Sequence, residues 1–205
     1  MSTEKKLALI KKKVVTVLAF AVLFGGIAAA LSIYVLPKQY QAHVSMIIVR
    51  DPSAYQSDLY TDLRAGLELI KDYREIIKTD SILNEVKYGA AGQVPQLQDL
   101  PNADMRKKIT FDSTTDSRVF TILYQDTDPQ VARIVADKLA EVLKQKVAIL
   151  LQVDMLAIMG PAELPVESTT PDIVVNTSLG FLLGLAGSSL LILFIDYWRN
   201  LDSHV

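Results

Sequence analysis

The sequence contains no cysteine and only two histidines among its 205 residues. A chain without cysteine forms no disulfides and has no thiolate chemistry, so its folded part must be held by its core alone. His43 and His204 lie on either side of a long apolar run near the C-terminus, and we expect a membrane to separate them. No Gly-x4-Gly-Lys-Ser/Thr motif occurs, so the chain has no P-loop of its own. We therefore expect no catalytic, cofactor-binding or metal-ligating residues.

The charged residues are nearly balanced, with a formal net charge of −2 and a pI near 5.7. Domains that bind nucleic acid usually carry a clear basic patch. The one basic cluster of the sequence lies just before an apolar run and consists of Lys5, Lys6, Lys11, Lys12 and Lys13. Its position explains it as a signal for membrane topology, so we expect no nucleic-acid partner.

Two long apolar runs lie near the ends of the chain, at residues 14–36 and 173–195. A helix of about 20 apolar residues is long enough to cross the hydrocarbon layer of a bilayer. The few polar residues of the second run can be satisfied by its own backbone or by a neighbouring helix; they are Asn176, Thr177, Ser178, Ser188 and Ser189. We predict a transmembrane helix at each run.

The alternative for the first run is a cleaved signal peptide, because lysines precede it and residues 28–30 are small alanines. Its length argues against cleavage, since a signal peptide has only about 7 to 15 apolar residues in its central region. The basic cluster precedes the first run, whereas acidic residues precede the second. This bias predicts a protein of the cell membrane with two helices. Residues 1–13 and 196–205 would be cytoplasmic, and the central domain extracytoplasmic.

Residues 37–159 show the patterns of an α+β domain. In residues 40–50, apolar side chains alternate as in a half-buried strand, with Ala42, Val44, Met46 and Ile48 on one face. Residues 108–112 and 119–125 flank a turn-forming stretch at 113–117 and predict an antiparallel hairpin. The sequence therefore predicts a small antiparallel sheet packed with helices.

Three shorter helices are expected in this domain, at about residues 57–77, 81–86 and 103–107. Ser57 or Asp58 would cap the first of them, and Thr79 or Asp80 the second. Residues 87–101 have two glycines, two prolines and neither periodicity, so we expect a loop there.

The strongest local signal predicts one long helix. Asp128 is a suitable N-cap, Pro129 suits the first helical position, and apolar residues recur on one face from Val131 to Leu150. We expect this helix to run to about residue 159, where Gly160 and Pro161 end it.

Residues 160–172 form a linker that contains Pro161, Pro165 and Pro171. Proline favours extended backbone, so this linker is either a semi-rigid strut before the second membrane helix or a plain connection. Composition does not separate the two.

Gly180, Gly184 and Gly187 form a small-residue stripe on the second apolar run. Glycine lets membrane helices approach closely, although it is also common in such helices as background. The packing partner would be the first helix, through Ala21, Gly25 and Ala29, or another subunit.

Taken in order, these segments resemble the Wzz-type chain-length-determinant family, in its Gram-positive, CpsC-like branch of capsular or exopolysaccharide co-polymerases and tyrosine-kinase modulators. The segments that carry the resemblance are residues 36–42 (LPKQYQA), 62–66 (DLRAG), 69–77 (LIKDYREII), 82–86 (ILNEV), 116–118 (DSR) and 128–132 (DPQVA). The proline segment before the second apolar run completes the order. Many relatives carry Asn where this chain has Asp137, which we expect to be exposed.

The resemblance implies a non-enzymatic membrane protein that forms homo-oligomers and helps to set the length or export of a polymer built on a lipid carrier. Its partners would be other copies of itself, a polysaccharide polymerase or the lipid-linked polysaccharide, and a cytoplasmic tyrosine kinase. It also places the subunit contact at or near Asp72, Tyr73, Arg74 and Glu75. The periodicity of that segment alone is equally explained by a core Tyr73 beside solvated charges.

The resemblance departs at the C-terminus, where relatives extend further beyond the second helix. In this chain, residues 196–205 would contact the kinase, with Tyr197 and Trp198 as candidate contacts. An aromatic pair after an apolar run is also typical of an anchor at the membrane interface. Two other function classes stay open: a two-helix sensor or ligand-binding receptor, which the topology equally allows, and a hydrolase, for which no paired-carboxylate spacing stands out.

Overall fold

The computed structural model describes residues 3–49, 59–114, 117–152 and 154–202. The expected cap at Ser57 or Asp58, the end of the first predicted strand at Arg50 and part of the predicted 113–117 turn lie outside the described residues. The chain divides into two compact units. One combines Met1–Pro37 with Thr170–Val205, and the other is Lys38–Thr169.

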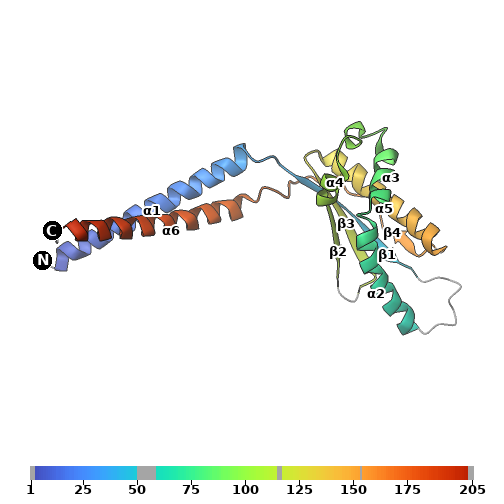
Figure 1. Ribbon diagram of the computed structural model, residues 1–205, viewed down its shortest axis with the longest axis horizontal. Coiled ribbons are helices and arrows are strands. Elements are labelled where there is room, and N and C mark those ends of the chain that lie inside the picture. The colour runs from blue at the N-terminus through green and yellow to red at the C-terminus, as the bar shows by residue number, and fades with distance from the viewer. Residues whose placement is uncertain (1–2, 50–58, 115–116, 153, 203–205) are drawn as a thin grey trace. The chain divides into compact units, whose positions relative to one another are not determined.

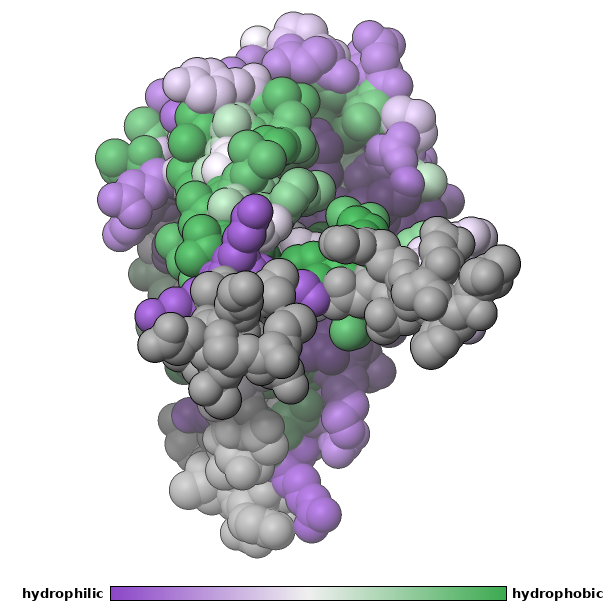
Figure 2. Space-filling view, turned by 90° about the vertical axis from the view of Figure 1, so that its left-hand side faces the viewer, coloured by the Kyte–Doolittle hydropathy of each residue, from purple (hydrophilic) through white to green (hydrophobic). Residues whose placement is uncertain are grey.

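The first unit is a pair of long helices, α1 (Thr3–Tyr34) and α6 (Ile173–Asp202), which pack against each other (Figure 1). Their apolar parts, Lys11–Tyr34 and Ile173–Ile195, have 24 and 23 residues. Both are long and apolar enough to cross a membrane, as predicted. Figure 2 shows hydrophobic (green) side chains gathered on the face that it presents, and the exposed apolar residues of the pair include Leu18, Val22 and Leu183.

The second unit contains a four-stranded antiparallel sheet in the order β2-β3-β1-β4. The strands are β1 (Tyr40–Ile48), β2 (Ile109–Ser113), β3 (Val119–Asp126) and β4 (Leu156–Ile158). All four predicted inward residues of β1 are buried, from Ala42 to Ile48. The predicted hairpin of β2 and β3 is confirmed, with Phe111 opposite Ile122.

Helices pack on one face of this sheet (Figure 1). The longest, α5 (Pro129–Leu151), lies against β1 and β3, and the Asp128 side chain caps it by accepting from the Gln130 backbone N–H at 2.8 Å. The remaining helices of the unit are α2 (Leu59–Ile76), α3 (Asp80–Ala90), η1 (Pro95–Leu97) and α4 (Asn102–Lys108). The predicted α+β class with two flanking membrane helices is confirmed.

The prediction of one helix to about residue 159 is wrong. Gln152 adopts a left-handed conformation with φ 58°, and α5 ends at Leu151. The chain then turns back as β4, where Leu156 is buried and pairs with Ile48. The edge of β1 carries unpaired backbone groups that a local helix pattern does not reveal, and β4 satisfies them.

The segment expected to be a loop at residues 87–101 is also partly helical. Helix α3 continues to Ala90, and η1 follows after a short turn. Ala90, Val94 and Leu97 are all buried in the core, so tertiary packing stabilises a segment whose glycines and prolines obscure its periodicity.

Candidate functional site

The described residues contain no group of three or more His, Cys, Asp or Glu side chains that could hold a metal ion. His43 is exposed on the outer face of β1. The features that could carry function are helix contacts, exposed charges and grooves, each within one of the two compact units.

The contact between α1 and α6 depends on glycine. A Cβ atom at Gly184 would lie 2.9 Å from the Ala21 Cα and 2.9 Å from the Phe24 Cβ. One at Gly180 would lie 2.5 Å from the Ala28 Cβ and 2.9 Å from the Phe24 carbonyl oxygen. These distances are shorter than any side chain tolerates, so the two glycines allow the backbones to approach.

The third residue of the stripe lies outside this contact, since a Cβ at Gly187 would have nothing within 4 Å. On α1, the contact uses Ala21, Gly25 and Ala28, whereas the sequence suggested Ala29 for the last of them. Near the other end of the pair, the Asn176 side-chain amide donates to the buried Ser32 hydroxyl at 3.0 Å. This polar pair joins the two helices through a hydrogen bond between their side chains.

The α2 segment from Asp72 to Glu75 has one buried and three exposed side chains. Tyr73 is only 1% exposed, and its ring lies 6.0 Å from that of Phe120. Burial, with a smaller contribution from the charge of Asp72, raises the pKa of the Tyr73 phenol. Asp72, Arg74 and Glu75 are exposed.

Arg74 is held against the β2 strand. Its guanidinium donates to the Ser113 hydroxyl at 3.1 Å and lies 5.4 Å from the centre of the Phe111 ring. It lines a groove of about 450 Å³ between α2 and the turn end of the β2–β3 hairpin. The described lining residues are Arg64, Leu67, Glu68, Ile70, Lys71, Arg74, Ser113, Thr114 and Ser117.

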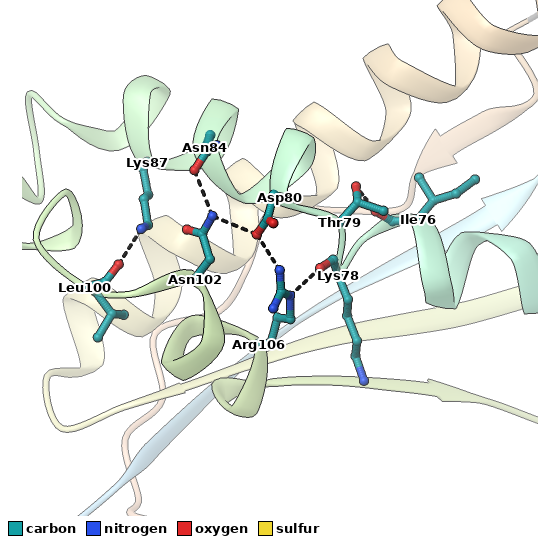
Figure 3. A network of polar contacts seen from close by, with 9 residues as sticks. All are labelled: Ile76, Lys78, Thr79, Asp80, Asn84, Lys87, Leu100, Asn102 and Arg106. Carbon is teal, nitrogen blue, oxygen red and sulfur yellow. Dashed lines mark hydrogen bonds and ion pairs between the residues drawn. The ribbon is translucent and has the colours of Figure 1, made fainter.

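A polar network joins the α2–α3 corner to α4 (Figure 3). The Arg106 guanidinium donates to the Lys78 carbonyl at 2.8 Å and forms an ion pair with Asp80. The Asn102 amide donates at 2.9 Å both to Asp80 and to Asn84. Because Arg106 and Asn102 of α4 contact Lys78, Asp80 and Asn84, the network fixes the α2–α3 corner against α4.

The proline linker contacts the second unit at Ala162, whereas most of its side chains are exposed. The backbone N–H of Ala162 donates to the Asp137 carboxylate at 2.6 Å, and Ala162 is buried. The expectation that Asp137 is simply exposed is wrong, because its carboxylate holds this segment. Pro161 is exposed and Pro165 is half-buried. Pro171 belongs to the other unit, next to Asp172, which caps α6 through the Val175 N–H at 3.0 Å.

Tyr197 and Trp198 lie on the last turns of α6, which continues past the apolar run to Asp202. Their side chains are 64% and 55% exposed, and the Trp198 ring lies 6.1 Å from that of Phe194. Both aromatic side chains are thus accessible, whether to headgroups or to a protein partner.

Comparisons with known proteins agree along almost the whole chain. A family model described as chain length determinant protein matches residues 7–89. The capsular polysaccharide biosynthesis protein CpsC of Streptococcus pneumoniae is 31% identical over 191 residues, which cover 92% of this chain and 80% of CpsC. The chain belongs to the Wzz family of chain length determinants.

Two further matches are more distant. The probable capsular polysaccharide biosynthesis protein YwqC of Bacillus subtilis is 25% identical over 97% of this chain and 79% of YwqC. A solved structure of a full-length bacterial polysaccharide co-polymerase aligns over 97% of this chain and 98% of its own, with a TM-score of 0.48 and 11% identity.

Within this Wzz-family protein, the part matched by the family model runs from α1 through β1 and α2 into α3. Sequence reasoning found the exposed charges of α2 and the glycines of α6, but it missed three features: the groove beside α2, the network around Asp80 and the contact of Asp137 with Ala162. Each joins residues at least 18 positions apart, so no local pattern could have indicated them.

Proposed function

We propose that this protein is a non-enzymatic membrane scaffold that helps to set the chain length or export of a capsular or exopolysaccharide. The observation that supports the proposal is the match to CpsC over 92% of the chain, which includes both candidate membrane helices and the domain between them.

In this proposal both termini are cytoplasmic and the Lys38–Thr169 unit lies outside the membrane. The lysine cluster before the apolar part of α1 supports this orientation, because basic residues stay on the cytoplasmic side. The domain would then lie on the side of the membrane where it meets the growing polymer and its polymerase.

The test is deletion of the gene in the source bacterium, followed by sizing of the surface polysaccharide on a gel. We expect a changed length distribution or reduced surface polymer, restored by the wild-type gene on a plasmid. An unchanged amount and length distribution in the deletion strain would contradict the proposal.

The alternative of a two-helix sensor or receptor is favoured by one feature, the groove beside α2 with its converging polar groups. A receptor would bind a small ligand and change gene expression or another output while polymer length stays normal. The deletion strain therefore separates the two functions.

We also propose that the protein modulates a cytoplasmic tyrosine kinase through Tyr197 and Trp198. The accessible side chains at the end of α6 support this. Truncation after Ile195, with a substitute Trp-Lys anchor, should keep the protein inserted while kinase phosphorylation is lost. Phosphorylation that persists in this variant would identify the aromatic pair as an interfacial anchor only.

A further inference from the structure

We propose that the groove between α2 and the β2–β3 hairpin, here called the basic groove, binds an anionic saccharide unit, a sugar that carries a carboxylate or a phosphate. The basic groove is the 450 Å³ hollow lined by Arg64, Lys71, Arg74 and the hairpin residues Ser113, Thr114 and Ser117. The choice of a saccharide rests on the proposed function, whereas the choice of an anion rests on the groove itself.

The cations of the basic groove share one face of α2. Arg64, Lys71 and Arg74 are spaced by seven and three residues, which brings them to the same side of a helix. Leu67 and Ile70 lie between them and give the groove an apolar base. A sugar ring fits such a surface, because its C–H groups pack on apolar side chains while its hydroxyls reach the polar walls.

Among the described residues that line the basic groove, cations outnumber anions, since three cations face one carboxylate, that of Glu68. Glu68 pairs with Lys71 at 2.9 Å, and both side chains are about 70% exposed (71% for Lys71 and 69% for Glu68). An ion pair this exposed is weak and can exchange for a ligand anion.

Arg74 is fixed in place before any ligand arrives. The Ser113 hydroxyl and the Phe111 ring hold its guanidinium from two directions, so little side-chain entropy is lost when it binds. A guanidinium presents several N–H donors in one plane, and one contact with Ser113 leaves others for a carboxylate or phosphate.

The opposite wall supplies hydroxyl groups. Ser113, Thr114 and Ser117 lie at the turn end of the hairpin. The Ser113 hydroxyl accepts from Arg74 and the Ser117 hydroxyl accepts from the Val119 N–H, and each still has its own O–H to donate to a ligand. A volume of about 450 Å³ lies within the range of small-ligand pockets. Cations on one wall and hydroxyls on the other match the charge and the hydroxyl groups of an acidic sugar.

The test is a binding titration of the full-length protein in nanodiscs with three probes. They are a hyaluronan hexasaccharide, which carries carboxylates, glucose 1-phosphate, which carries a phosphate, and neutral maltohexaose. We expect binding of at least one anionic probe, weakened by added NaCl, and no binding of maltohexaose. The two anionic probes tell which acidic group the groove takes.

The decisive variant is Arg64→Gln with Lys71→Gln, which removes two cations and leaves Arg74 in place. We expect its affinity for the bound probe to fall at least about tenfold, as for lost hydrogen bonds to charged groups. The matched control is Arg133→Gln with Lys107→Gln, two exposed cations on α5 and α4 away from the groove. The control should bind like the wild type.

Four results would overturn the proposal: no binding of either anion, equal binding of maltohexaose, equal loss in the control, or a changed assembly mass of the groove variant. The last would mark the groove as a contact between protein copies. Expression of the groove variant in the deletion strain keeps the two proposals apart. If this variant binds neither anion and still restores polymer length, the groove has no role in setting polymer length. The proposed function of the protein would still stand.

Discussion

At the scale of single residues, the three glycines of α6 separate into two kinds. A Cβ at Gly184 would meet the α1 backbone at 2.9 Å from the Ala21 Cα and 3.0 Å from the Phe20 carbonyl oxygen. Backbone atoms cannot move aside as a flexible side chain does, so the helices themselves would have to separate. Gly187 has open space at the same position, and it therefore offers a matched control.

We predict that Gly184→Ala destabilises the α1–α6 pair by about 1–3 kcal/mol, the usual cost of overpacking a close contact. Gly187→Ala should change the stability of the pair little, within about 0.5 kcal/mol. Thermal unfolding of both variants in detergent, followed by circular dichroism, measures the difference. Equal midpoints for the two variants would mean that the glycine stripe is background composition.

Two buried tyrosines give the domain a dependence on alkaline pH. Tyr73 and Tyr124 are almost fully buried, and among the described residues neither hydroxyl has a hydrogen-bond partner. Burial is the main cause that raises the pKa of both phenols, because it disfavours the phenolate. A phenol whose pKa is higher in the folded than in the unfolded state stabilises the folded protein. This contribution is complete below the unfolded pKa of about 10, and it is lost as the pH rises through the folded pKa.

We therefore predict that the free energy of unfolding falls above about pH 10. The double substitution Tyr73→Phe with Tyr124→Phe should flatten this fall, and it should cost little at pH 7 because both hydroxyls are unpaired. Urea unfolding between pH 8 and 11 is the measurement. A pH profile that is the same in the double variant would show that other groups cause the loss.

At the scale of elements, the contact of Asp137 with Ala162 joins α5 to the segment after β4. Its carboxylate oxygen accepts from the backbone N–H of the buried residue Ala162. Leaving that N–H unpaired would lower the free energy of unfolding by about 1–3 kcal/mol. Asn retains an acceptor oxygen at the same place, whereas Ala has none. The two substitutions thus separate the acceptor from the charge.

We predict that Asp137→Ala loosens residues 160–169 and that Asp137→Asn leaves them close to the wild type. Hydrogen exchange of peptides from this segment in the full-length protein should be markedly faster in the Ala variant. If the two variants exchange equally fast, the negative charge and not the hydrogen bond holds the segment.

At the scale of the whole molecule, the proposed assembly depends on the exposed charges of α2. Tyr73 is buried in the core and Arg74 donates a hydrogen bond to Ser113. Substitutions of Asp72 and Glu75 therefore test a subunit contact more directly. Both are exposed, and their substitution leaves the core and the basic groove intact.

We predict that Asp72→Arg with Glu75→Arg lowers the mass of the assembly in detergent or nanodiscs, because like charges facing each other across a contact are repulsive. The control is Asp99→Arg with Glu163→Arg, two exposed acidic residues away from α2. Mass photometry reads out both variants. An unchanged mass for the α2 variant would move the subunit contact elsewhere.

Features with a local physical cause could be predicted from the sequence by itself. The two apolar runs indicate membrane helices because length and apolarity decide spanning. The alternation from Ala42 to Ile48 indicates the inner face of β1, and the Asp128-Pro129 pair indicates the start of α5, because each is a rule about neighbours in the chain.

The tertiary structure alone decided the features that join distant residues. Leu156 belongs to a strand, although the sequence pattern predicts a helix there, because β4 pairs with the edge of β1. Gly184 and Gly187 look alike in sequence, and only the path of α1 separates them. The basic groove likewise exists only because the hairpin brings Ser113 to Arg74, 39 residues away in the chain.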